Sequence, residues 1–245
     1  MSARTVDWTA ATGRTEGLRE RKKRETRQRL TDTATEMFLA RGFDAVRVSE
    51  IAEACGVSEK TVFNYFPSKE ALILDHPDTA IAALRVGLAD PDHTPTESAL
   101  RILAGELGAI TAWLAAEPDL AVASGRLSRF GALIDTTPAL RAYQWDQTDQ
   151  LITTAAHALA ERAGLAPDDP EPRIAATALV GLWQVQFAAL HKHVDGIRTP
   201  AQVRRAVTAE VTRAARVIDT GLATFTAKPR SRRRRVDAAG GAAAR

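Results

Sequence analysis

Two short helical segments separated by a tight turn constrain the fold of this 245-residue chain more than any other feature. From Val48 onward, apolar or small residues recur at spacings of three and four, which predicts a helix of about two turns. Gly56 can then supply the positive φ angle of a turn, and Ser58 can cap a second helix over residues 59–65. Helices this short are not stable alone, so both must pack against neighbours.

The register of three residues gives this pair a specific geometry. Ala52 is small where the two helices must cross, Gly56 turns the chain, and Val62 points back to hold the second helix against the first. This is the pattern of a helix-turn-helix, whose second helix enters the major groove of DNA. With Val62 inward, a rotation of about 100° per residue places Lys60 and Asn64 nearly opposite, on the outer face.

The rest of the sequence predicts an all-α protein of about nine helices. Apolar residues recur at helical spacing, proline and glycine stand at the breaks, and strand-like alternation with hairpin turns does not occur. One further helix should begin after Ser68 and end or bend at Pro77. The longer helices are expected over about residues 19–41, 78–89, 96–116, 119–134, 138–163, 171–193 and 199–226.

Positive charge gathers at the two ends of the sequence, although the net charge is only +3. Residues 31–227 carry 17 Lys and Arg against 25 Asp and Glu, so the basic excess lies before and after this range. The first basic run, over residues 14–29, leads directly into the helix-turn-helix, which predicts contact with DNA phosphates. For the second run, over residues 228–245, contact with DNA and a solvated tail are both open.

A longer segment, GFDAVRVSEIAEACGVSEKTVFNYFPSKEALI, resembles the N-terminal DNA-binding domain of TetR-family regulators. The resemblance covers about residues 19–74, and the rest of the chain is similar to the family only in length and helical texture. It implies a dimeric bacterial transcription repressor. The partners it implies are a double-stranded DNA operator and a small-molecule effector.

The resemblance also implies a division of the all-α fold into four segments. We expect a disordered basic arm over residues 1–18 and a helix-turn-helix DNA-binding domain over residues 19–67. A helical domain for ligand binding and dimerisation should follow over residues 68–227, and a disordered arginine-rich tail over residues 228–245.

Helix geometry and the resemblance together indicate which residues contact DNA. Lys60 and Asn64 can hydrogen-bond to bases, and Phe63 can pack on a thymine methyl group. Helix starts and basic side chains supply phosphate contacts, which set affinity more than sequence choice. The residues expected at the interface are Arg19, Lys22, Lys23, Arg47, Ser49, Ser58, Glu59, Lys60, Thr61, Phe63, Asn64, Tyr65 and Lys69.

Two positions depart from the usual pattern of the family. Arg47 stands where the family usually has a threonine that caps the first short helix, so a cap is lost while a phosphate contact can be gained. Phe63 stands where many members have tyrosine, and its ring has no hydroxyl to donate to a phosphate. The preferred operator sequence therefore stays open.

The last two helices carry long apolar faces. In the helix over residues 171–193, one stripe contains Ile174 and Ala178 and another contains Trp183 and Phe187, which predicts burial on two sides. Such a pair at the end of a chain suits a four-helix interface in a homodimer. Ordinary packing within one chain is the alternative.

Aromatic residues behind the DNA-binding segment fall on helices that line the ligand cavity in the TetR family. They suit an apolar or aromatic ligand with few polar anchors, and packing in the core is the alternative for each. Gln184, Gln186 and His191 are candidate polar anchors. The aromatic candidates are Trp113, Phe130, Tyr143, Trp145, Trp183 and Phe187.

Several chemistries are not indicated. The sequence has no P-loop, dinucleotide-binding glycine pattern, G-x-S-x-G elbow or metal-ligand helix motif, so an enzyme is not expected. No cofactor and no metal are expected, because His191 and His193 point to different sides of one helix. The single Cys55 excludes an internal disulfide; we interpret it as a small buried thiol, with a redox sensor as the alternative.

The sequence also lacks a run of about 18 apolar residues and a secretory signal, so a cytoplasmic protein without a membrane partner is expected. Alternatives to a repressor remain open. An activator or a nucleoid-like DNA binder would use the same DNA-binding helices. A small-molecule carrier or an enzyme would retain them only as a vestige.

Overall fold

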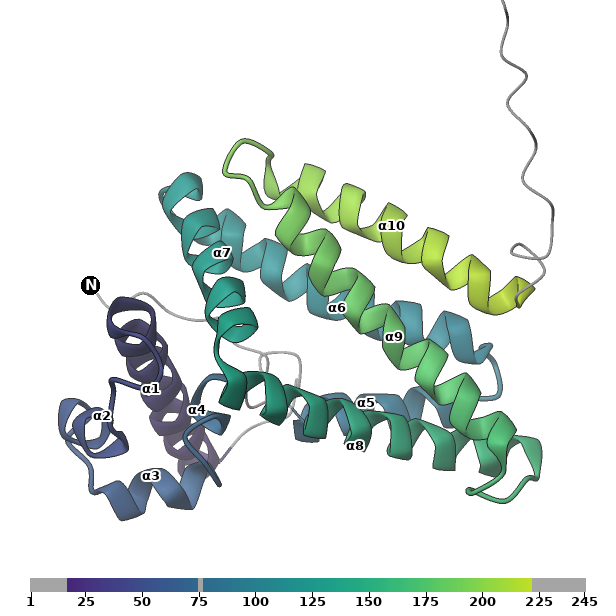
Figure 1. Cartoon of the computed structure of the whole chain (residues 1–245), viewed down its shortest axis with the longest axis horizontal. Helices are drawn as coiled ribbons and strands as arrows, with labels where there is room; N and C mark the ends of the chain where they lie inside the picture. Colours follow the sequence, from purple (N-terminus) through teal and green to yellow (C-terminus); the bar gives the residue numbers. More distant parts are fainter. Residues whose placement is uncertain (1–16, 75–76, 222–245) are drawn as a thin grey trace, which may run out of the picture.

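The computed structural model describes residues 17–74 and 77–221, and within these ranges it contains ten α-helices and no β-strand (Figure 1). The predicted all-α fold is confirmed, with ten helices instead of about nine. The helices are α1 (Leu18–Arg41), α2 (Val48–Ala54), α3 (Glu59–Tyr65), α4 (Ala71–Leu74), α5 (Pro77–Ala89), α6 (Pro95–Ala116), α7 (Leu120–Thr136), α8 (Pro138–Ala163), α9 (Pro170–His193) and α10 (Pro200–Thr220). Residues 1–16 of the predicted arm and the whole predicted tail lie outside the described residues.

Proline sets the start of the long helices. It occupies the first position of α6, α8, α9 and α10, where the missing backbone N–H costs nothing. At α6 the Thr94 hydroxyl accepts from the Glu97 amide at 3.1 Å, and the Glu97 carboxylate accepts from the Thr94 amide at 2.8 Å. At the other end of the chain α10 ends at Thr220, and residues 222–226, which were predicted to continue it, lie outside the described residues.

The first four helices share one hydrophobic core, which we call the N-terminal cluster. Phe38 of α1, Ile51 of α2 and Val62 of α3 are buried in it. Ala71, Leu72 and Ile73 of α4 belong to the same cluster, although the sequence predicts that the C-terminal domain begins at residue 68. We therefore propose a domain boundary after Leu74.

The remaining six helices form a second bundle. α9 packs along α8 and α10, α5 lies against α8, and α6 contacts α5, α9 and α10 (Figure 1). Val203, Val207 and Val211 of α10 are buried in the core of this bundle, as their spacing predicts. The C-terminal bundle therefore provides a body separate from the N-terminal cluster.

α6 and α9 are long and apolar enough to cross a membrane by length and composition alone. Each packs against four other helices of the C-terminal bundle. The buried apolar residues of α6 and α9 belong to the core of the C-terminal bundle, so packing within the bundle explains why these residues are apolar.

The two-sided burial predicted for the helix over residues 171–193 is wrong at its start. Ile174 is 71% exposed and Ala178 is also exposed. The packing of α9 explains this, because its buried positions, including Leu179 and Leu182, face α8, α10 and α6. Ile174 and Ala178 lie on a face of α9 that residues 17–74 and 77–221 leave uncovered.

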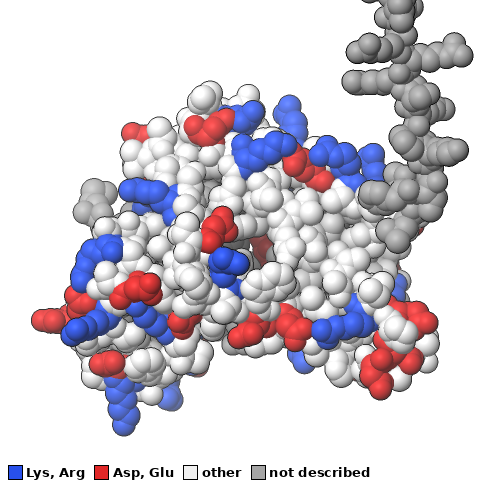
Figure 2. Space-filling model, viewed as in Figure 1, with Lys and Arg blue, Asp and Glu red and all other residues white. Residues whose placement is uncertain are grey.

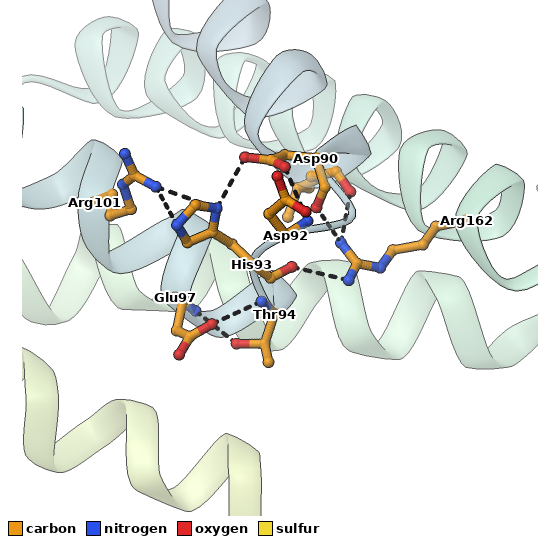
Figure 3. A network of polar contacts seen from close by, with 8 residues as sticks. Asp90, Asp92, His93, Thr94, Glu97, Arg101 and Arg162 are labelled. Atoms are coloured by element: carbon orange, nitrogen blue, oxygen red, sulfur yellow. Dashed lines mark hydrogen bonds and ion pairs between the residues drawn. The ribbon is translucent and has the colours of Figure 1, made fainter.

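Arg162, near the end of α8, closes the bundle at the turn between α5 and α6 (Figure 3). Its guanidinium donates to the carbonyls of Leu88 at 3.3 Å, Asp90 at 2.9 Å and His93 at 2.9 Å. Carbonyls at the end of a helix and in the turn after it have no partner within the helix. One arginine side chain satisfies these three carbonyls. In the same turn the Asp90 carboxylate accepts from the Asp92 amide and from the His93 ring, and these contacts lower the pKa of Asp90.

The end of α7 and the start of α8 connect the two bodies. Ile134 of α7 and Leu140 of α8 are buried in the N-terminal cluster. α7 also contacts α1, and α8 contacts α4. The α7–α8 junction is therefore packed against the helix-turn-helix domain.

Candidate DNA-binding interface and ligand pocket

α2 and α3 cross as the positions of Ala52, Gly56 and Val62 predict. Ala52 and Val62 are 3% and 1% exposed, and both lie in the N-terminal cluster. Gly56 has φ +65°, and the next amide, of Val57, donates to the Ala52 carbonyl at 3.0 Å. Since Val62 points inward, the opposite face of α3 points into solvent.

Three side chains form the outer face of α3. Lys60, Phe63 and Asn64 are all exposed, and the Phe63 ring keeps 47% of its surface accessible. Ser58 caps the helix, with its hydroxyl 3.1 Å from the Thr61 amide and 2.8 Å from the Thr61 hydroxyl. The ammonium of Lys60, the ring of Phe63 and the amide of Asn64 are groups that can contact the edges of bases in a major groove.

An arginine of α1 holds the end of α3. Arg27 donates from Nη1 to the Tyr65 carbonyl at 2.7 Å, and its guanidinium lies 4.5 Å from the centre of the Phe66 ring. Sequence reasoning missed this role, because Arg27 stands within a basic run whose members look alike. The contact fixes the orientation of α3 relative to α1.

Lys69 is predicted to contact a phosphate, and the structure places its ammonium on the protein. Nζ donates to the Phe43 carbonyl at 2.6 Å and lies 4.2 Å from the centre of the Phe43 ring and 5.6 Å from that of Phe38. Burial lowers the pKa of Lys69. The residue thus ties the segment after α3 to the end of α1, and a phosphate contact stays a prediction.

Arg47 begins α2 without a side-chain cap. Its amide donates to the Glu50 carboxylate at 2.7 Å, but its guanidinium cannot accept from the Glu50 amide. Glu50 also pairs with Arg41 of α1 at 2.9 Å, and these hydrogen bonds to Arg47 and Arg41 lower the pKa of Glu50. The Arg47 side chain is exposed and remains available to a phosphate.

The other predicted phosphate contacts lie around this face. Arg19, Lys22 and Lys23 are exposed on the first turns of α1, and Ser49 and Glu59 are exposed at the starts of α2 and α3. Figure 2 shows basic side chains, interspersed with acidic ones, over α1 to α3 at the lower left. Thr61 and Tyr65 are half-buried on the shoulders of α3.

Replacing Arg47 with threonine should raise the free energy of unfolding by about 1 kcal/mol, because a threonine hydroxyl can accept from the Glu50 amide. Arg47 already has the extended backbone of a cap residue, with φ −97° and ψ 149°. If Arg47 contacts a phosphate, the same change should also reduce the slope of log K against log salt by about 1. Urea denaturation and fluorescence anisotropy at several salt concentrations measure the two effects.

Arg85→Thr, at an exposed position of α5, is the control for this change. It should produce neither the stability gain nor the change in salt slope. A less stable Arg47→Thr protein would contradict the capping argument, and an unchanged slope would contradict the phosphate contact.

Five of the six predicted ligand residues are half-buried and pack against one of the two cores. Phe130, Tyr143 and Phe187 pack against the N-terminal cluster, and Trp113 and Trp183 pack against the core of the C-terminal bundle. The sixth, Trp145, is 65% exposed on the outside of α8 because the buried side of that helix faces α5 and α9. Its role in a pocket is therefore not supported.

The three candidate polar anchors also differ in burial. Gln184 is exposed, Gln186 is buried, and His191 is half-buried. The His191 ring lies edge-on to the Phe187 ring, with centres 4.2 Å apart, and burial lowers the pKa of His191. It also covers Gly131 of α7 so closely that a Cβ atom there would lie 1.7 Å from His191 Nε2.

Other polar candidates have structural partners. His193 and Lys192 both contact the Glu210 carboxylate, at 2.9 and 2.7 Å, and lower the pKa of Glu210 to about 2. Among residues 17–74 and 77–221, no cluster of three potential metal ligands occurs. The Cys55 thiol is buried and lies 3.3 Å from the Thr33 hydroxyl.

Residues 30–75 match the family model of bacterial regulatory proteins, tetR family, and residues 124–209 match that of the MftR C-terminal domain. TcmR of Streptomyces glaucescens, an HTH-type transcriptional regulator, is 34% identical over 62% of this chain and 67% of its own. The putative mycofactocin biosynthesis transcriptional regulator MftR of Mycobacterium tuberculosis is 28% identical over 66% of this chain and 78% of its own.

Among solved structures, NalD of Pseudomonas aeruginosa, the secondary repressor of the MexAB-OprM multidrug efflux pump, aligns at 21% identity with a TM-score of 0.46. The alignment covers 78% of this chain and 97% of NalD. The sequence relatives are transcriptional regulators and not enzymes, as predicted. Together with the helix-turn-helix, these sequence matches show that the chain belongs to the TetR family of transcriptional regulators.

Proposed function

We propose that this chain is a cytoplasmic repressor that binds a palindromic DNA operator as a homodimer and leaves it when a small, largely apolar or aromatic ligand binds. The observation that carries this proposal is the outer face of α3. Lys60, Phe63 and Asn64 are exposed there, on a helix that Val62 and Arg27 fix from behind.

Within this proposal, the three residues of that face read bases in the major groove. Arg47, Ser49, Ser58, Thr61 and Tyr65 contact phosphates on either side, and Arg19, Lys22 and Lys23 add affinity through release of counterions. Glu59 borders the groove, and Lys69 supports the interface mainly by holding the segment after α3. Arg27 supports the interface indirectly, because it orients α3.

We propose that the dimer forms through α9 and α10. Support comes from a row on the outer side of α9 in which Ile174, Ala178, Gly181, Val185 and Ala188 follow each other at alternating spacings of four and three residues. All five are exposed or half-buried, and such a seam suits a partner helix. A two-fold axis would set the two copies of α3 about 34 to 36 Å apart, one turn of DNA.

We place the effector pocket between α7, α8 and α9. Figure 2 shows a hollow in this face of the molecule, within the triangle that these three helices outline in Figure 1. Trp183, Phe187 and His191 follow each other at spacings of four along α9 and so share one side of that helix. The contact of His191 with Gly131 of α7 supports the view that this side faces the hollow.

The packing of the pocket residues suggests how a ligand acts on DNA binding. Phe130, Tyr143 and Phe187 pack against the same cluster as Ile134 and Leu140 of the α7–α8 junction. A ligand that fits better when this junction shifts would favour a conformation in which the two copies of α3 no longer match the groove spacing. By reciprocity, operator DNA would weaken ligand binding by the same factor.

Selection of bound sequences from random DNA duplexes tests the proposal. An inverted repeat with half-sites about 10 base pairs apart is the expected result. A set of bound sequences without a common motif would overturn it.

A further inference from the structure

One carboxyl group is half-buried in the C-terminal bundle and accepts a hydrogen bond from an indole. Glu106 of α6 stands between Leu103, Leu107 and Ile110, which are buried in the core. Its Oε1 accepts from Trp183 Nε1 of α9 at 3.2 Å. Its side chain is half-buried among apolar residues, whereas carboxylates shielded from solvent in proteins are as a rule paired.

Burial raises the pKa of Glu106 to about 7, and the hydrogen bond from Trp183 opposes this only in part. No charged neighbour contributes to the shift. The empty protein therefore holds a proton on this carboxyl for part of the time at neutral pH. A cation placed beside it would keep the group ionised and would remove the cost of its burial.

One further buried polar atom has no partner on the neighbouring helix α8. Nε2 of Gln147 is inaccessible to solvent and makes no hydrogen bond. Tyr143 and Phe187 pack against one cluster, and α8 and α9 are neighbours that run in opposite directions. Gln147 follows Tyr143 by one turn and Trp183 precedes Phe187 by one turn, so Gln147 lies toward the same end of the helix pair as the indole that bonds to Glu106.

Unpartnered buried polar atoms are rare, and an acceptor atom on a bound ligand would give the Gln147 amide its missing partner. The aromatic walls suit a flat ring system, and the indole of Trp183 also offers a face to a cation. We propose that this pocket binds a flat aromatic cation, and that the Glu106 carboxylate pairs with its protonated nitrogen. The inference rests on the proposed function, because it names the class of ligand for that pocket.

Three compounds of equal ring size test this inference. 9-Aminoacridine is a cation at neutral pH, acridine is neutral at pH 8, and acridine-9-carboxylate is an anion. Full-length protein without DNA is titrated with each by calorimetry and tryptophan fluorescence at pH 8. The cation should bind at least about tenfold more tightly than acridine, since a hydrogen bond to a charged group is worth that much. The anion should bind most weakly.

The pH dependence provides a second readout. Below its pKa, Glu106 must release its proton before the cation binds, so affinity for 9-aminoacridine should rise about tenfold between pH 6 and 8 and level off above that. Burial lowers the pKa of His191, and because His191 is present in both the wild type and Glu106→Gln, a pH dependence that came from its ring would persist in that variant.

Glu106→Gln keeps the shape of the side chain and removes its charge. It should abolish the preference for the cation and its pH dependence while acridine binding persists. Glu161→Gln, at an exposed position of α8, is the matched control and should behave as the wild type. Equal binding of cation and neutral ring by the wild type, failure of the cation to bind, or an unchanged preference in Glu106→Gln would each overturn the inference.

Failure of this inference is distinguishable from failure of the proposed function. DNA selection is measured on the same preparations. A protein that selects an inverted repeat and binds acridine without preferring the cation keeps its proposed function and loses only the ligand class. A protein that selects no sequence loses the proposed function, whatever it binds.

Discussion

Alanine at both Lys60 and Asn64 should abolish sequence-specific DNA binding and leave the fold intact. Both side chains are exposed on the outer face of α3 and belong to none of the buried clusters, so their removal costs little stability. Each base contact is worth about 1 to 3 kcal/mol of discrimination, so the pair should cost the selected operator about 30-fold or more in affinity. Fluorescence anisotropy with the selected duplex and a scrambled duplex measures the loss.

Binding to the scrambled duplex is the internal reference for this prediction. It rests on phosphate contacts, so the double variant should lose much less affinity there than on the operator. Arg85→Ala, an exposed change of a basic residue on α5, should leave both affinities close to wild type. If the double variant still discriminates between the duplexes, the outer face of α3 is not the reading surface.

Alanine at Gly131 should destabilise the protein by about 1 to 3 kcal/mol, the usual cost of inserting an atom into a packed contact. The new Cβ would lie within 2.8 Å of three atoms of the His191 ring. That ring is held by its edge contact with Phe187 and cannot move without disturbing the pocket. Urea denaturation followed by circular dichroism measures the change.

A second substitution makes this prediction specific. His191→Ala removes the ring that the new Cβ atom would strike, so combining it with Gly131→Ala should cost less than the sum of the single changes. Gly105→Ala on α6 is the matched control, because a Cβ there has no atom within 4 Å and alanine favours a helix. Additive effects of the two substitutions would contradict the close contact between α7 and α9.

The helix-turn-helix could be predicted because its determinants are local. The positions of Ala52, Gly56 and Val62 within a short segment decide which faces of α2 and α3 are buried. A capping threonine followed by proline likewise predicts where α6 and α10 begin. These signals act within one or two turns, so periodicity and capping rules are enough.

Features that depend on distant partners could not be predicted. Arg162 caps α5 from more than 70 residues away, and Trp183 meets Glu106 across 77 positions. Nothing near Glu106 in the sequence distinguishes it from a solvent-exposed glutamate. Trp145 and Ile174 are exposed although the sequence predicts burial. Each is an apolar residue at helical spacing, but the neighbouring helices pack against the other side of α8 and of α9.

The central claim is that two copies of this chain read one operator, each with its own α3. Native mass spectrometry of the protein mixed with a duplex that carries a single selected inverted repeat tests it most directly. We predict a complex of two chains and one duplex, and much weaker binding to a duplex with only one half-site. A complex of one chain per duplex that binds the half-site equally well would contradict the claim.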